Sequence, residues 1–126
     1  KIKNPETSAK FRANSNQFYL LSVDVGRLND QTVCCVFRVN VSNDGKYFAT
    51  LVNLYVLGRQ AETKTFNRQA IELKRIIKKF NPLEVVIDTN GLGIGFADEM
   101  IREQVDEFGN IYEPLGFKND EDFLKV

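Results

Sequence analysis

The chain contains no histidine and no tryptophan, and it has only two cysteines and one methionine among 126 residues. The absence of histidine excludes Ser-His-Asp and Cys-His catalysis, histidine metal ligands and the commonest general base. Cys34 and Cys35 are adjacent, so along a strand they point to opposite faces and suit neither a disulfide nor a metal site. We therefore expect them to be reduced residues, in the core or half-buried, of an intracellular protein.

The sequence also lacks an excess of charge of either sign. Lys plus Arg and Asp plus Glu each number 17, so a nucleic-acid partner would need a local basic patch, a metal site or another domain. No apolar run is long enough to span a membrane, and we expect no signal peptide. At this length and with 43% hydrophobic residues, we expect one globular domain with a real core. The first residue is not Met, which indicates a piece of a longer protein.

An apolar run that ends near a carboxylate is the feature around which we interpret the rest. Residues 18–33 read FYLLSVDVGRLNDQTV, with Asp24 close to the end of the run and a Gly–Arg turn behind it. Such a run is typical of a strand that is buried on both faces. A buried carboxylate needs an ion partner, hydrogen bonds or a metal. The alternative is that Asp24 only caps the exit turn of the strand.

The first half of the chain predicts a meander of three strands. Residues 1–16 are polar and are interpreted as a linker or as an arm from a preceding domain. Strands are expected at 18–25, 32–40 and 47–57, with a short polar connection between the first two. The third follows Ser42-Asn43-Asp44-Gly45, where Asp-Gly supplies the positive φ of a tight hairpin.

The hydrophobic period then changes to that of a helix. Apolar residues recur at helical spacing over 66–80, Thr63 or Thr65 is the expected cap, and Asn81-Pro82 the expected stop. The basic residues off this stripe are interpreted as a solvated face near the helix C-terminus rather than a binding patch. They are Lys74, Arg75, Lys78 and Lys79.

A short apolar strand at 84–88 ends in Asp88 and leads into a glycine-rich loop at 90–95. The loop opens a second helix at about 96–108, with Gly109 as its stop, and 111–115 is a weak last strand. The residues expected to face inward from this helix are Ala97, Met100, Ile101, Val105 and Phe108.

This order of elements predicts an α/β fold with a mixed sheet in the strand order 3-2-1-4-5 and flanking helices. Because the crossover through the first helix is right-handed, the fourth strand lies beside the first and parallel to it. Asp24 and Asp88 then emerge at the same carboxyl edge of the sheet, where α/β sheets build their sites. Two converging carboxylates need a cation or a raised pKa, and Mg²⁺ or Mn²⁺ is the simplest cation without histidine.

Together these residues give the chain a resemblance to the ribonuclease H-like fold. Within it, LLSVDVGRLNDQTV and VVIDTNGLGIGFADEM are similar to the nuclease domain of phage terminase large subunits. The resemblance implies a domain over 17–126 in which Asp24 and Asp88 are catalytic, metal-binding residues. The family's third acidic residue lies on a later helix, and the Asp120-Glu121-Asp122 cluster comes too early for it. We therefore expect the domain to be incomplete at its C-terminus, and the chain alone to be inactive or a poor nuclease.

The function implied by the resemblance is that of a metal-dependent endonuclease of a viral DNA-packaging terminase, which cuts DNA with little sequence specificity. Two Mg²⁺ or Mn²⁺ ions about 4 Å apart would activate a water and stabilise the leaving oxygen. Asp24 would bridge both ions and Asp88 would hold one. Asp30 is either an outer-shell ligand or a turn residue, and Arg27 is either a phosphate contact or an exposed turn residue.

In the loop, Asn90 and Gly91 are candidate DNA contacts, because backbone amides at a helix start face anions well. The alternative is a loop chosen only for its backbone freedom. Partners implied by the resemblance are double-stranded DNA, the terminase ATPase domain, the small terminase subunit and the portal, with no membrane. The expected location is the cytoplasm of an infected or lysogenic host cell.

Three other interpretations stay open. The first is a nucleotide- or dinucleotide-binding module that uses the loop from Gly91 to Gly95, although Phe96 stands where the dinucleotide fingerprint needs its third glycine. The second is one half of a sugar-kinase-like ATPase, for which Thr32 would have to contact phosphate. The third is a non-catalytic interaction domain.

Overall fold

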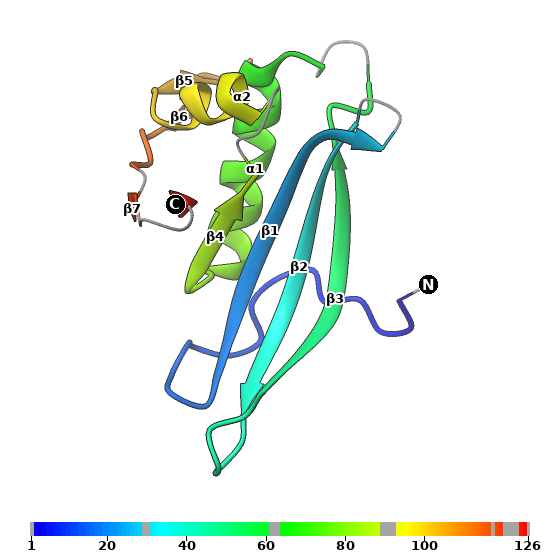
Figure 1. Cartoon of the computed structure of the whole chain (residues 1–126). Coiled ribbons are helices and arrows are strands. Elements are labelled where there is room, and N and C mark those ends of the chain that lie inside the picture. Colours follow the sequence, from blue (N-terminus) through cyan, green and yellow to red (C-terminus); the bar gives the residue numbers. More distant parts are fainter. Residues whose placement is uncertain are drawn as a thin grey trace.

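The main sheet of the protein is mixed, and its helices pack on one of its faces (Figure 1). The computed structural model describes residues 2–28, 31–60, 64–88, 93–116, 118–119 and 124–125. For residues 27–28, 118–119 and 124–125 it describes only the backbone.

The expected meander is formed by β1 (Gln17–Leu28), β2 (Gln31–Val41) and β3 (Tyr47–Leu57), paired antiparallel in that order. Its second hairpin closes at Gly45, which has a φ of 81° and donates its N–H to the Ser42 carbonyl at 2.9 Å. The first strand is longer than predicted. Gly26 takes a φ of 62° within a local irregularity, and this lets the strand resume its pairing at Leu28.

The helix α1 (Phe66–Phe80) follows the predicted bounds because both ends carry specific caps. The Thr65 hydroxyl oxygen accepts the N–H of Arg68 at 3.3 Å, which satisfies one of the free amides of the first turn. Asn81 takes a left-handed conformation with a φ of 46° and donates its N–H to the Ile77 carbonyl at 2.8 Å. The alternative cap, Thr63, lies outside the described residues.

After α1 the chain forms β4 (Glu84–Ile87), which lies beside β1 and parallel to it. The predicted α/β fold with the strand order 3-2-1-4 is therefore confirmed. The strand beside β4, the fifth in the sheet, is not the predicted strand at 111–115. That position is taken by β8 (Leu124–Lys125), antiparallel to β4, with β7 (Lys118–Asn119) beyond it.

The expected fifth strand instead forms part of a small second sheet, in which β6 (Ile111–Tyr112) pairs with β5 (Gln104–Val105). The cause is a tight hairpin between these two strands, with Gly109 at its turn. Gly109 has a φ of 83° and donates its N–H to the Asp106 carbonyl at 3.1 Å. The backbone groups of the segment are thus satisfied locally rather than by β4.

The same hairpin shortens the second helix, α2 (Gly93–Met100), relative to the predicted 96–108. Ala97 and Met100 are buried as expected. The prediction was wrong for the rest of the inward-facing set, because the chain leaves the helix after Met100. The exposed members are Ile101, Val105 and Phe108, with exposed fractions of 47%, 54% and 80%.

The described part of the N-terminal segment packs against the sheet. Glu6 is 6% exposed, accepts a hydrogen bond from the Tyr19 hydroxyl and forms an ion pair with Arg38. Phe11 stacks on the Tyr19 ring at 4.5 Å between centroids. The buried charge of Glu6 is thereby paired, as a buried carboxylate requires.

The two faces of the main sheet differ in what covers them. Along β1, the buried residues Tyr19, Leu21, Val23 and Val25 point toward the core shared with α1 and α2. The residues between them, which include Asp24, are half-buried and lie on the opposite face by strand alternation. The candidate carboxylate therefore lies on the face away from the two helices.

Candidate functional site

The pairing of β1 with β4 brings the two predicted acidic residues to the same level of the sheet. Val23 is the register partner of Ile87, and the N–H of Asp88 donates to the Val23 carbonyl at 3.0 Å. The next residues along the chain are Asp24 on β1 and Asp88, which directly follows the end of β4. Neighbouring strands lie about 4.8 Å apart, and side chains at the same level of a parallel pair share a face. The two carboxylates therefore start from adjacent backbone positions at the carboxyl edge of the sheet.

Both positions are open to solvent to different degrees. Asp24 is half-buried, whereas Asp88 is exposed. Strand β2 contributes Cys35 to the same face, opposite Ser22 of β1. Burial raises the pKa of the Cys35 thiol, and the negative charge of Asp24 raises that pKa further.

The other predicted site residues are not brought into this geometry by the described part of the chain. The backbone of Arg27 belongs to β1, but its side chain is not described. Asp30, Asn90 and Gly91 lie outside the described residues. Within the described ranges, no group of three or more histidine, cysteine, aspartate or glutamate side chains is placed to hold a metal ion. The candidate metal ligands among the described residues are therefore the two carboxylates of Asp24 and Asp88.

The last glycine of the predicted loop belongs to α2 and has a packing role. A Cβ at Gly95 would lie 2.9 Å from the Cε2 atom of Phe66, a distance that requires something to shift. Phe66 begins α1 and meets Phe96 edge to face, with ring centroids 6.1 Å apart. Gly95 therefore lets the two helices approach closely, which is a reason for glycine that needs no phosphate.

Thr32, the residue that a sugar-kinase-like ATPase would need for phosphate, is 1% exposed. Its hydroxyl oxygen accepts the N–H of Gly26 at 3.3 Å. Thr32 thus stabilises the irregular end of β1 next to Asp24 rather than presenting a hydroxyl to solvent.

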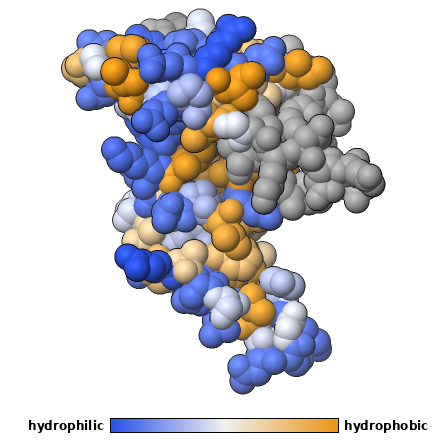
Figure 2. Space-filling model, turned by 90° about the vertical axis from the view of Figure 1, so that its left-hand side faces the viewer, coloured by the Kyte–Doolittle hydropathy of each residue, from blue (hydrophilic) through white to orange (hydrophobic). Residues whose placement is uncertain are grey.

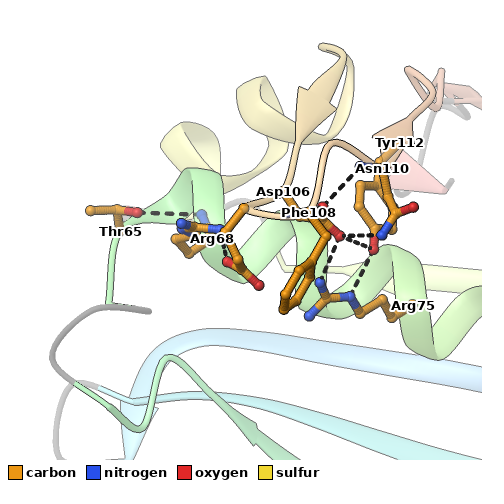
Figure 3. A network of polar contacts seen from close by, with 8 residues as sticks. Thr65, Arg68, Arg75, Asp106, Phe108, Asn110 and Tyr112 are labelled. Carbon is orange, nitrogen blue, oxygen red and sulfur yellow. Dashed lines mark hydrogen bonds and ion pairs between the residues drawn. The ribbon is translucent and has the colours of Figure 1, made fainter.

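Sequence reasoning missed a second acidic centre, at Asp106 (Figure 3). Its carboxylate accepts the N–H groups of Phe108 and Asn110, both at 2.9 Å, and the Asn110 side-chain amide at 3.0 Å. The Tyr112 hydroxyl and the Arg75 guanidinium also donate to it, each at 3.0 Å. Five donors therefore converge on one carboxylate whose side chain is fully inaccessible to solvent.

Burial alone would raise the pKa of the Asp106 carboxyl, but the hydrogen bonds from Asn110, Phe108 and Tyr112 outweigh it. They hold the pKa well below its usual range. The sequence signal for this centre is Asp106 followed by Gly109, although Gly109 by itself predicts the end of a helix. The contribution of Arg75, 31 residues earlier, had no local signal.

A further buried charge lies close by on α1. Lys74 is 6% exposed, and its ammonium donates to the Arg102 carbonyl at 2.8 Å and to Gln104 Oε1 at 2.6 Å. Burial lowers the pKa of Lys74, and the charge of Glu99 opposes that shift. Both acceptors lie in the segment that follows α2, so Lys74 attaches that segment to α1.

Comparison of the chain with protein-family models, with curated proteins and with solved structures gave no match. Within the described ranges, no helix combines the length and the apolar character needed to cross a membrane. The proposal below therefore rests on the geometry of the site and on the sequence resemblance.

Proposed function

We propose that the chain is part of a ribonuclease H-like, metal-dependent endonuclease domain of the kind found in DNA-packaging terminases, with Asp24 and Asp88 as its metal-binding residues. The observation that carries the proposal is the register of β1 against β4, which sets the two acids on adjacent parallel strands. A fold can host many functions, so the two carboxylates, and not the sheet that carries them, support the proposal.

Carboxylate oxygens are the ligands that Mg²⁺ and Mn²⁺ prefer, so the donor set fits such an ion. A divalent ion held there would supply Lewis acidity toward a phosphodiester and would lower the pKa of a bound water. Asp24, half-buried on the central strand, is the better placed of the two to bridge ions. Asp88, exposed at the strand end, leaves the edge accessible to a DNA phosphate.

Two carboxylates neutralise one divalent ion but do not hold two, so we expect weak activity from this chain. The test is nicking of supercoiled plasmid DNA in Mn²⁺ over long incubation, with an EDTA control. Asp24→Asn and Asp88→Asn should each reduce nicking by roughly hundredfold or more, because each removes a ligand charge. Asp44→Asn is the matched control, since Asp44 is an exposed acid in the β2–β3 turn.

Nicking that persists unchanged in Asp24→Asn would contradict the assignment. The alternative of a nucleotide-binding module makes the opposite prediction, because nucleotide binding through the 90–95 loop would not need the Asp24 charge. Binding of a fluorescent nucleotide with and without metal separates the two interpretations.

A further inference from the structure

A basic groove lies between the C-terminal half of α1 and β6, on the flank of the molecule where Figure 2 shows hydrophilic and hydrophobic groups side by side. Its volume is about 490 Å³. A second hollow of about 420 Å³ shares Lys78, Ile111 and Tyr112 with it, so the two adjoin. The residues that line the groove are Arg75, Lys78, Lys79, Asn110, Ile111 and Tyr112.

The charge of this groove is concentrated and is not neutralised within the described part of the chain. Lys78 and Lys79 are exposed, and neither ammonium forms an ion pair with a described acid. Among the described residues, Asp106 is already bound by Arg75, and Glu113 lines only the second hollow. Although the chain has no net charge, several of its cationic side chains are therefore concentrated in one groove.

The guanidinium of Arg75 is held in a fixed position at this groove (Figure 3). Its Nε donates to the Tyr112 hydroxyl at 2.8 Å, its Nη2 donates to Asp106 at 3.0 Å, and it stacks over the Tyr112 ring at 5.5 Å from the centroid. A guanidinium carries five N–H donors in a rigid fork, so these two bonds leave others for an anion. The side chain is 42% exposed, which makes those donors accessible.

A helix C-terminus attracts lysines through its dipole, which explains Lys78 and Lys79 by themselves. It does not explain a groove whose other wall, formed by β6 and the preceding Asn110, adds an aromatic ring and a side-chain amide to the cations. A fixed guanidinium, exposed ammonium groups, an amide and an aromatic ring are groups that contact sugar and phosphate.

We propose that this groove binds the phosphate backbone of DNA as a contact separate from the carboxylate pair. The choice of DNA among polyanions rests on the proposed function. The groove belongs to the helix layer, whereas Asp24 and Asp88 lie on the opposite face of the sheet, so each can be altered without the other.

The test is fluorescence anisotropy of a short labelled duplex in EDTA, where no cleavage takes place. The double variant Lys78→Gln, Lys79→Gln should weaken binding by roughly ten- to hundredfold at about 0.1 M salt, and reduce the slope of log K against log salt by about 1.8. The control Lys3→Gln, Lys46→Gln removes the same charge at exposed sites away from the groove and should bind within about twofold of the unaltered protein.

Equal binding by the groove variant and the control would overturn the proposal, as would no binding of the duplex by the unaltered protein. Displacement by poly-glutamate as effective as by unlabelled DNA at equal charge would also overturn it, in favour of an acidic protein partner. Binding of the duplex in EDTA requires no metal at the carboxylate pair. Failure of the nuclease proposal alone would therefore remove Mn²⁺-dependent nicking while leaving the difference between groove variant and control.

Discussion

The protein places acidic side chains in two contrasting settings, the Asp106 centre and the edge where β1 and β4 end. At Asp106 the chain itself supplies a guanidinium and four further donors to a single carboxylate (Figure 3). At the sheet edge the register brings Asp24 and Asp88, two like charges, to adjacent positions. A carboxylate whose acceptor sites are filled by the protein's own hydrogen-bond donors stabilises the fold. Two like charges that converge favour a cation between them.

The largest expected difference between the two settings is in stability. Asp106→Asn should lower the melting temperature by roughly 10 °C, because it leaves the Arg75 charge without its partner and replaces an acceptor oxygen with an NH2 group that faces other donors. Asp24→Asn should change the melting temperature by no more than about 2 °C, or raise it, because it relieves repulsion with Asp88. Thermal unfolding followed by circular dichroism measures both. A large loss in Asp24→Asn would show that Asp24 is a structural turn residue.

Acid titration measures how much the Asp106 carboxylate contributes to stability. The pKa of Asp106 is lower in the folded protein than in the unfolded chain, so its contribution to stability is complete above the unfolded value of about 4. That contribution should be lost progressively as the pH falls from about 4 toward the lower folded pKa. Urea unfolding at several pH values should therefore show a flatter acid dependence in Asp106→Asn than in the unaltered protein. Parallel curves for the two proteins would contradict this account.

The smallest expected effect is a change in the reactivity of Cys35, which depends on the charge of Asp24. Because Asp24 contributes to the raised pKa of Cys35, Asp24→Asn should lower that pKa and speed alkylation of Cys35 at mildly alkaline pH, by roughly twofold. Cys34 is the internal control. Burial and the neighbouring Cys35 raise its pKa to about 12, so it should react only on unfolding. Mass spectrometry of each cysteine measures the rates, and an unchanged Cys35 rate would place the Asp24 charge elsewhere.

Local sequence signals were sufficient for the meander, for α1 and for the position of β4. Asp44-Gly45, Thr65 and Asn81 each fix a backbone conformation with their own atoms, so they can be recognised without knowing the fold. Parallel pairing of β4 with β1 followed from the handedness of a single crossover, and this placed Asp24 and Asp88 on adjacent strands.

The segment after Met100 could not be predicted in the same way. Its apolar residues continue a helical spacing, but Lys74 and Arg75 of α1 bind the segment through contacts that span about thirty positions. Such long-range bonds outweigh local propensity and leave Phe108 exposed. The prediction of a solvated face was wrong for Lys74, which is buried against the same segment. Arg75, Lys78 and Lys79 had no local signal for a groove, because its other wall includes Tyr112.

Mn²⁺ binding, followed by electron paramagnetic resonance of the free ion during titration, tests directly whether the two strand-end acids bind metal. We expect the unaltered protein to bind Mn²⁺ weakly, Asp24→Asn and Asp88→Asn each to lose this binding, and Asp44→Asn to retain it. Binding that survives in both strand-end variants, or no binding by the unaltered protein, would contradict the claim that Asp24 and Asp88 hold a divalent ion together.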